Sequence, residues 1–160
     1  MSDPMSSTMS STTANRVAIN TAEEINRRIR RATEARVRAL AANPDGIERR
    51  LDELEEEWDI ERVLETNASA LAFGGLALGV TVDKKWLALP ALVTAFLFQH
   101  AVQGWCPPIP ILRRFGVRTA REIDDERTAL KALRGDFATL VPDDADPAAR
   151  AERAMQAVRR

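Results

Sequence analysis

ASALAFGGLALGVTVDKKWLALPALVTAFLFQHAV, residues 68–102, is the stretch that decides how this chain folds. Its side chains that are charged at neutral pH are confined to Asp83, Lys84 and Lys85, so the windows on either side of them carry no charge. The chain as a whole is not apolar, because 45% of its 160 residues are hydrophobic and 29% are charged. Since the apolar residues gather in one block between arginine- and glutamate-rich flanks, the pattern is typical of two adjacent membrane-spanning helices.

The two apolar windows differ in length. The window before Asp83 makes about 22 Å of helix, which is short of a hydrocarbon core of roughly 30 Å unless the preceding turn is added. The window after Lys85 makes about 31 Å and has Trp86 and Trp105 near its two ends, where an aromatic ring favours the membrane interface. We therefore predict a transmembrane hairpin over residues 67–106, with spans at about residues 67–82 and 86–105.

Small residues predict how the two helices of the hairpin pack. The three residues between the windows leave room for a tight turn between antiparallel neighbours. Gly75 and Gly79 are four residues apart in the first span, and Ala91 and Ala95 are four apart in the second. This spacing lets helix backbones approach closely, so we expect helix packing through these four residues.

Charged amphipathic helices are predicted in residues 21–66, which makes the fold class all-α. Thr21 with Glu24 forms a capping box for a first helix that runs to about Ala42. Asn-Pro-Asp-Gly at residues 43–46 then breaks the chain. A second helix follows and meets no proline or glycine before the apolar block, so we expect it to continue directly into the first span.

The remaining segments are predicted from their composition. Residues 1–20 lack the apolar run of a secretory signal and predict a disordered tail. Residues 107–141 begin with a Pro/Arg-rich turn and continue, through a capping box of Thr119 and Glu122, as an amphipathic helix. Residues 142–160 predict a flexible tail.

Basic residues near the span ends predict the orientation of the hairpin. The connecting turn offers two lysines, and a larger number of arginines flank the outer ends: Arg49, Arg50, Arg62, Arg113, Arg114, Arg118 and Arg121. Both termini are therefore predicted to be cytoplasmic. The alternative is a soluble helical protein whose flanking helices bury the hairpin, but their apolar stripes are narrow for that task.

Composition bounds the function. A formal net charge of −1 gives no overall basic field for nucleic acid, so we expect no nucleic-acid partner. One cysteine and one histidine cannot make a closed zinc site within one chain, and no catalytic group of residues is found. We expect no enzyme, cofactor or metal, and a protein that serves as an anchor, scaffold or small subunit, with the lipid bilayer and a second copy or another membrane protein as partners.

Polar residues near the end of the second span are the candidate functional contacts. Those inside the membrane edge are Gln99, His100 and Gln103. Cys106 is either a thiol that handles sulfur or redox equivalents or a small packed residue, and Arg113 and Arg114 would lower its pKa if they lay close. A transporter or channel would instead need several hairpins whose polar residues face one another. The arginines of residues 27–38 are candidates for contact with anionic lipid or with the acidic run of residues 53–57.

The sequence Gly104-Trp105-Cys106-Pro107 closes the second span. The chain resembles the YgaP-like inner-membrane domain family of bacteria over about residues 65–108. The resemblance lies in two short spans that are joined by a few residues, the second of which ends in this Gly-Trp-Cys-Pro sequence. The resemblance implies a multi-pass domain of the bacterial inner (plasma) membrane with no assigned biochemical role, which in some relatives is attached to a rhodanese sulfurtransferase domain. The flanks here have no α/β alternation and no second cysteine, so that activity does not carry over.

Overall fold

The computed structural model describes residues 16–138 and 154–155, and every regular element in that part of the chain is helical. The all-α fold class is therefore confirmed for the described residues. By its contacts the described part of the chain divides into two units, one with residues 16–29 and 58–121 and the other with residues 30–57 and 122–138.

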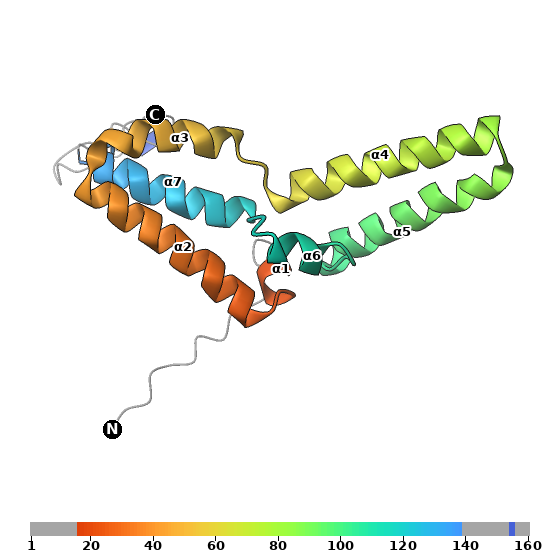
Figure 1. Cartoon of the computed structure of the whole chain (residues 1–160), viewed down its shortest axis with the longest axis horizontal. Coiled ribbons are helices and arrows are strands. Elements are labelled where there is room, and N and C mark those ends of the chain that lie inside the picture. The colour runs from red at the N-terminus through yellow and green to blue at the C-terminus, as the bar shows by residue number, and fades with distance from the viewer. Residues whose placement is uncertain (1–15, 139–153, 156–160) are drawn as a thin grey trace, which may run out of the picture. The chain divides into compact units, whose positions relative to one another are not determined.

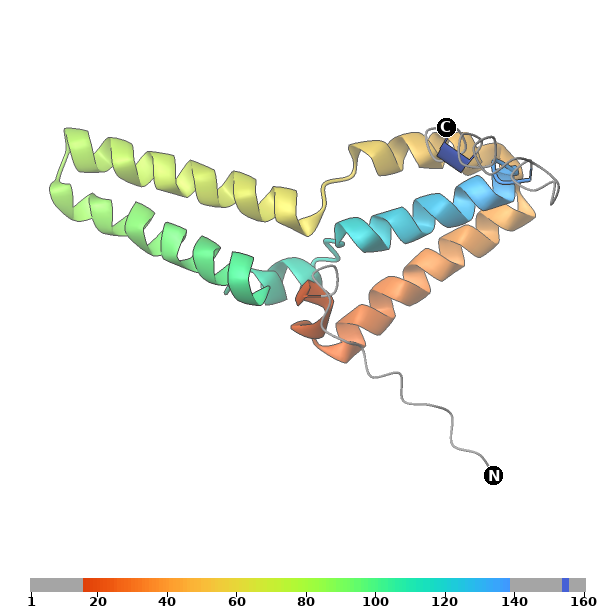
Figure 2. The same cartoon turned by 180° about the vertical axis from the view of Figure 1, so that it is seen from behind.

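The helices follow one another along the chain as Figure 1 shows. They are α1 (Arg16–Ile19), α2 (Glu23–Ala42), α3 (Ile47–Glu56), α4 (Ile60–Thr81), α5 (Ala88–Gln103), α6 (Ile109–Arg114) and α7 (Ala120–Arg134), with 3-10 turns η2 (Pro44–Gly46) and η3 (Lys84–Leu87). Seen from both sides in Figures 1 and 2, α4 and α5 run side by side as an antiparallel pair.

The pair of α4 and α5 confirms the predicted helical hairpin. Two helical stretches, Pro44–Thr81 and Lys84–Gln103, are long and apolar enough by length and composition to cross a membrane. The 22 residues of α4 span about 33 Å, and the 16 residues of α5 span about 24 Å before η3 is added. At the turn, the carboxylate of Asp83 accepts a hydrogen bond from the backbone N–H of Lys85 at 2.8 Å and so begins η3.

Two glycines lie where the helices of the hairpin touch. Gly75 and Gly79 are both buried in α4. A Cβ added at Gly75 would lie 2.6 Å from Cδ of Pro90, and one added at Gly79 would lie 2.5 Å from Cδ2 of Leu87. The absence of a side chain at these positions therefore lets α4 approach the beginning of α5.

The partner residues on α5 differ from those predicted. Ala91 and Ala95 are exposed, so the expectation that they pack inside the hairpin is wrong for a single chain. The residues that meet the glycines are Leu87, Leu89 and Pro90. At 3.6 residues per turn, Ala91 and Ala95 lie about 100° and 140° around the helix from Pro90, which turns them away from α4.

A break separates α3 from α4, so the expected continuous helix into the first span is wrong. The backbone at Glu57 is extended, with φ −65° and ψ 127°. Asp59 then acts as the N-cap of α4 and accepts a hydrogen bond from the N–H of Arg62 at 2.7 Å. The N–H of Ile60 donates to the carbonyl of Arg118 at 2.8 Å. Because the first N–H groups of α4 have these partners, a new helix start is stable here.

The N-terminal part of the described chain also differs from its prediction. The helix α1, Arg16–Ile19, lies within residues 1–20, where a disordered tail was expected, and its Val17 is 4% exposed. The hydroxyl of Thr21 donates to the carbonyl of Val17 at 2.7 Å and so completes α1, whereas the expected capping box would have used it for α2. The other predicted tail residues, 1–15 and most of 142–160, lie outside the described residues.

The second unit contains α3, most of α2 and most of α7. Its apolar cluster consists of Ile47, Leu51, Leu54, Ile123 and Leu130. Beside it the fully buried carboxylate of Glu126 is held by two guanidinium groups, with Arg36 Nη2 at 2.9 Å and Arg50 Nε at 2.9 Å. Each arginine reaches both oxygens of Glu126, so the buried charge is paired and hydrogen-bonded. The acid that pairs with Arg36 is therefore on α7, outside the acidic run of residues 53–57.

Candidate functional site

The candidate polar residues lie at the end of the hairpin where α4 begins and α5 ends. Gly104 ends α5 with a positive φ of 71°, and its N–H donates to the carbonyl of His100 at 2.7 Å. This left-handed conformation favours glycine. A Cβ at Gly104 would also overlap the Cβ of Arg16, so the glycine makes room for α1 at the end of the hairpin.

The short helix α1 provides hydrogen-bond donors for the end of α5. The last carbonyl groups of a helix have no partner within the helix. Arg16 Nη1 donates to the carbonyl of Ala101 at 2.5 Å, and Asn20 Nδ2 donates to that of Gln103 at 3.4 Å. The positive charge of Arg16 also suits the negative end of the helix dipole.

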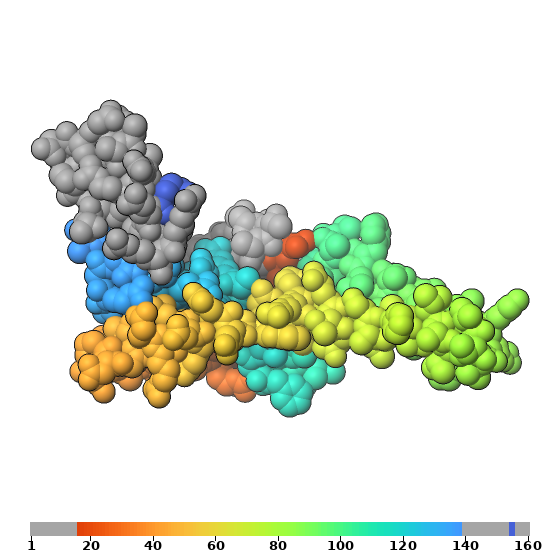
Figure 3. Space-filling model, turned by 90° about the horizontal axis from the view of Figure 1, so that it is seen from above, coloured from red at the N-terminus to blue at the C-terminus, as the bar shows by residue number. Residues whose placement is uncertain are grey.

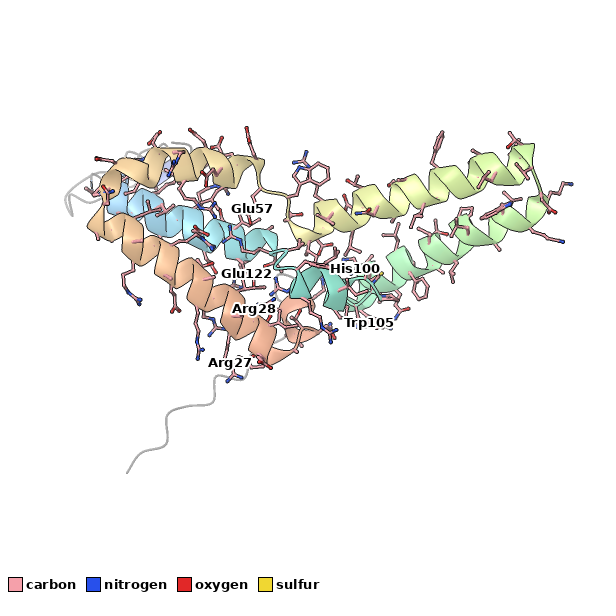
Figure 4. The ribbon with its side chains drawn as sticks, viewed as in Figure 1. Arg27, Arg28, Glu57, His100, Trp105 and Glu122 are labelled. Atoms are coloured by element: carbon pink, nitrogen blue, oxygen red, sulfur yellow. The ribbon has the colours of Figure 1, made fainter. Side chains whose placement is uncertain are left out.

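His100 joins the two helices of the hairpin at this end. Its Nε2 lies 2.6 Å from Oε2 of Glu61, in the first turn of α4. His100 is 6% exposed, whereas the Glu61 side chain is 40% exposed. Since a carboxylate only accepts, Nε2 is the donor. Figure 4 shows His100 near the beginning of α4, with Trp105 beyond the end of α5.

The two glutamines do not share this contact. Gln99 is half-buried and Gln103 is exposed, and their side chains make no hydrogen bond with the described residues. His100 Nδ1 is buried and has no hydrogen-bond partner in the same part of the chain. Of the three predicted polar contacts, the structure therefore brings His100 to a charged partner and leaves the other two without one.

Cys106 lies in an apolar cluster. The cluster consists of Val17, Ile60, Leu64, Cys106 and Ile109, and Cys106 is 4% exposed within it. Burial raises the pKa of the Cys106 thiol, because the thiolate would lose its hydration. The lowering of this pKa that nearby Arg113 and Arg114 would have caused is therefore not found. Since the thiolate is the reactive form, this environment suits a packed cysteine.

Arg113 has a role that the sequence interpretation missed. It is fully buried on α6, where Nη2 donates to Oδ1 of Asn26 at 2.9 Å and Nη1 donates to the carbonyl of Val117 at 3.0 Å. Asn26 in turn donates to the carbonyl of Ala18 at 2.8 Å. Arg113 thereby joins α6 to the beginning of α2. The available signal was its position four residues after the apolar Ile109, on the same face of a short helix.

Tryptophans lie at both ends of the hairpin. Trp86 is in η3 at the turn and is 45% exposed, while Trp105 follows α5 at the other end and is 36% exposed. Trp58, just before α4, is 45% exposed, and the guanidinium of Arg62 lies 4.3 Å from its ring centroid. A third aromatic ring is therefore near the open end of the hairpin, beside a cation that it attracts.

The described residues contain no group of three or more histidine, cysteine, aspartate or glutamate side chains that could hold a metal ion. Comparison with protein-family models, with curated proteins and with solved structures gave no match to this chain. The resemblance to the YgaP-like family therefore stays a prediction that rests on residues 104–107.

Proposed function

We propose that this protein is a non-enzymatic, two-span membrane protein whose hairpin anchors its charged helices at the cytoplasmic face of a bacterial inner membrane, as a scaffold or small subunit. The observation that carries the proposal is the exposure of the apolar helices. Within the apolar window of the first stretch 22% is buried, and within that of the second 6% is buried. A core helix of a soluble protein would be mostly buried.

The exposed side chains are large. Those on α4 and α5 that are at least half exposed include Leu71, Phe73, Leu76, Val80, Leu92, Phe98 and Val102. Leaving one such side chain in water costs of order 1.5–3 kcal/mol relative to burying it. Because the two helices carry them on several sides, a bilayer covers this surface without needing a protein partner on every face.

The dimensions of the hairpin support the same environment. About 33 Å of α4 separates the end that carries Trp58 and Trp105 from the end that carries Trp86. Residues 66–81 of α4 carry no charged side chain and make about 24 Å of this length, which a locally thinned bilayer accommodates, with aromatic rings at both interfaces. The charged residues of α4, Glu61, Arg62 and Glu65, lie in its first two turns and so at headgroup depth.

The anchor role is favoured over thiol chemistry by the environment of Cys106. Its burial and raised pKa disfavour the thiolate that sulfur or redox transfer would need. The fully buried Arg113 and Glu126 instead support a role for the flanking helices as fixed, folded parts. The partners that we propose are the bilayer and a second copy or another membrane protein.

Membrane fractionation tests the proposal. The expressed protein should remain in the membrane pellet after alkaline carbonate extraction. Reporter fusions at both termini should report a cytoplasmic location, and a fusion within the turn at Lys84 should report the outside. Release by carbonate would overturn the hairpin proposal. In parallel, Cys106→Ser should leave insertion and phenotype unchanged, and loss of function with normal insertion would favour thiol chemistry.

A further inference from the structure

The short helix α6, beside the open end of the hairpin, has two different faces. Ile109 and Arg113 are both fully buried on one side. On the other side Ile111 is 56% exposed and Phe115, the residue that ends the helix, is 82% exposed. Phe115 is the most exposed large apolar side chain among the described residues. The depth and the charged neighbours of this face favour one kind of occupant.

The depth of α6 is set by its packing on α4. Ile109 belongs to the same buried cluster as Ile60 and Leu64. Leu64 precedes Asn67, where the first predicted span begins, by about 5 Å along the helix axis. In Figure 3 the teal segment that contains α6 projects to one side of α4. When the hairpin spans a bilayer, α6 therefore lies beside it at the level of the headgroups.

Two arginines lie at the end of α6 that carries Phe115. Arg114 is exposed on α6 itself. Arg28 Nη2 donates to the carbonyl of Arg114 at 2.6 Å, so a second guanidinium lies at the end of the helix that carries Phe115. A short helix with apolar side chains and arginines together, at headgroup depth, has the features of an interfacial anchor.

We propose that α6 lies in the cytoplasmic membrane interface, with Ile111 and Phe115 inserted at the boundary of headgroups and acyl chains and with Arg114 and Arg28 binding anionic lipid phosphates. The proposal rests on the proposed function, because the hairpin sets the depth of α6. It adds a second attachment to the membrane, made by a segment that is too short to span.

Site-directed spin labels on the full chain test this depth. The background is Cys106→Ser, and single labels are placed through Phe115→Cys, through Leu76→Cys as the lipid control on α4, and through Glu55→Cys as the water control on α3. The protein is reconstituted in phosphatidylcholine vesicles with and without phosphatidylglycerol. Collision rates are then measured with oxygen, which enters lipid, and with a water-soluble nickel chelate.

Three outcomes are distinguishable. A label introduced by Phe115→Cys that collides with the chelate severalfold less often than the Glu55→Cys label, and with oxygen more often, supports the anchor. If it behaves like the Glu55→Cys label while the Leu76→Cys label stays in lipid, α6 faces water or a protein and the anchor proposal is overturned, although the hairpin stands. If the Leu76→Cys label is also accessible to the chelate, the proposed function itself fails.

The lipid charge supplies a second test that does not depend on the label at Phe115. Adding phosphatidylglycerol should lower the chelate accessibility of a label introduced through Ile111→Cys, and high salt should reverse that change. Arg114→Gln should reduce the response to phosphatidylglycerol severalfold while leaving carbonate resistance intact. An equal response in both chains would overturn the assignment of Arg114 to lipid phosphate.

Discussion

Replacing each of three glycines of α4 with alanine measures the contact between the two apolar helices. Gly74, Gly75 and Gly79 lie in the same helix, but an added Cβ meets different surroundings at each. At Gly74 it has nothing within 4 Å. At Gly75 it would lie 2.6 Å from Cδ of Pro90 and 3.1 Å from Cβ of Leu89. Gly74→Ala is therefore a matched control for Gly75→Ala.

The expected magnitude comes from subtracting one substitution from the other. Both alanines gain about the same helix propensity, up to roughly 1 kcal/mol, so this contribution cancels in the difference. Non-bonded carbon atoms prefer a separation of about 3.5–4.0 Å, so at Gly75 the ring of Pro90 must move by about 1 Å. Overpacking of this kind costs about 1–3 kcal/mol. We expect Gly75→Ala to be less stable than Gly74→Ala by that amount.

Gly79→Ala should lie between these two variants. Its added Cβ would be 2.5 Å from Cδ2 of Leu87, which is the end of a side chain that is 39% exposed. Leu87 can turn away, but its backbone nitrogen at 3.3 Å cannot. Reversible unfolding in mixed micelles of mild detergent and dodecyl sulfate, followed by tryptophan fluorescence, gives the three free energies. Equal values for Gly74→Ala and Gly75→Ala, within about 0.5 kcal/mol, would refute the helix contact at Gly75.

Three other measurements test the polar and thiol environments, two by substitution and one by alkylation. Glu126→Gln should lower the free energy of unfolding of the full chain, measured in a thermal melt, by about 2 kcal/mol. This is less than the roughly 3–5 kcal/mol for breaking a buried ion pair, because the Arg36 side chain is 38% exposed and can reach water. An unchanged melt would contradict this prediction. In the micelle titration, Glu61→Ala should lower the free energy of unfolding by about 1–3 kcal/mol more than Glu61→Gln does, because the glutamine amide keeps an acceptor for the buried His100 ring. Equal losses of stability would show that this contact is unimportant. Alkylation of Cys106 in the folded chain should reach half its maximal rate at a higher pH than alkylation in the chain unfolded by dodecyl sulfate. The reason is that the raised pKa of the buried thiol leaves less thiolate at each pH below it. Equal midpoints in the two states would contradict the burial of Cys106.

The hairpin could be predicted because its signal is local. Charged residues are absent from two neighbouring windows with a short polar turn at Asp83, and this pattern needs no knowledge of the rest of the fold. The spacing of Gly75 and Gly79 likewise marks a face of one helix. The face that α5 presents in return depends on how α5 is rotated about its axis, and tertiary contacts set that rotation. Ala91 and Ala95 were therefore assigned to the wrong face.

The candidate site was predicted less completely, because its contacts join residues far apart in the sequence. Arg113 and Asn26 are separated by 87 residues, and neither side chain alone indicates burial. Asp59 lies in a stretch without proline or glycine, so the sequence around it predicts the interior of a helix. Its carboxylate nevertheless caps the start of α4. His100 was identified as a polar contact from its position in an apolar window, but its partner Glu61 was not.

The cluster around Cys106 also constrains the order in which the chain can fold. Val17 comes before both apolar helices, Ile60 begins the first of them, and Ile109 follows the second, yet the three side chains are buried together. The hydrogen bond from Arg16 to Ala101 spans 85 residues of sequence. During synthesis this cluster cannot form until the segment after the second apolar helix has left the ribosome. The cluster therefore cannot close before both apolar helices have been made, and a chain that stalls between them leaves α1 without its docking site.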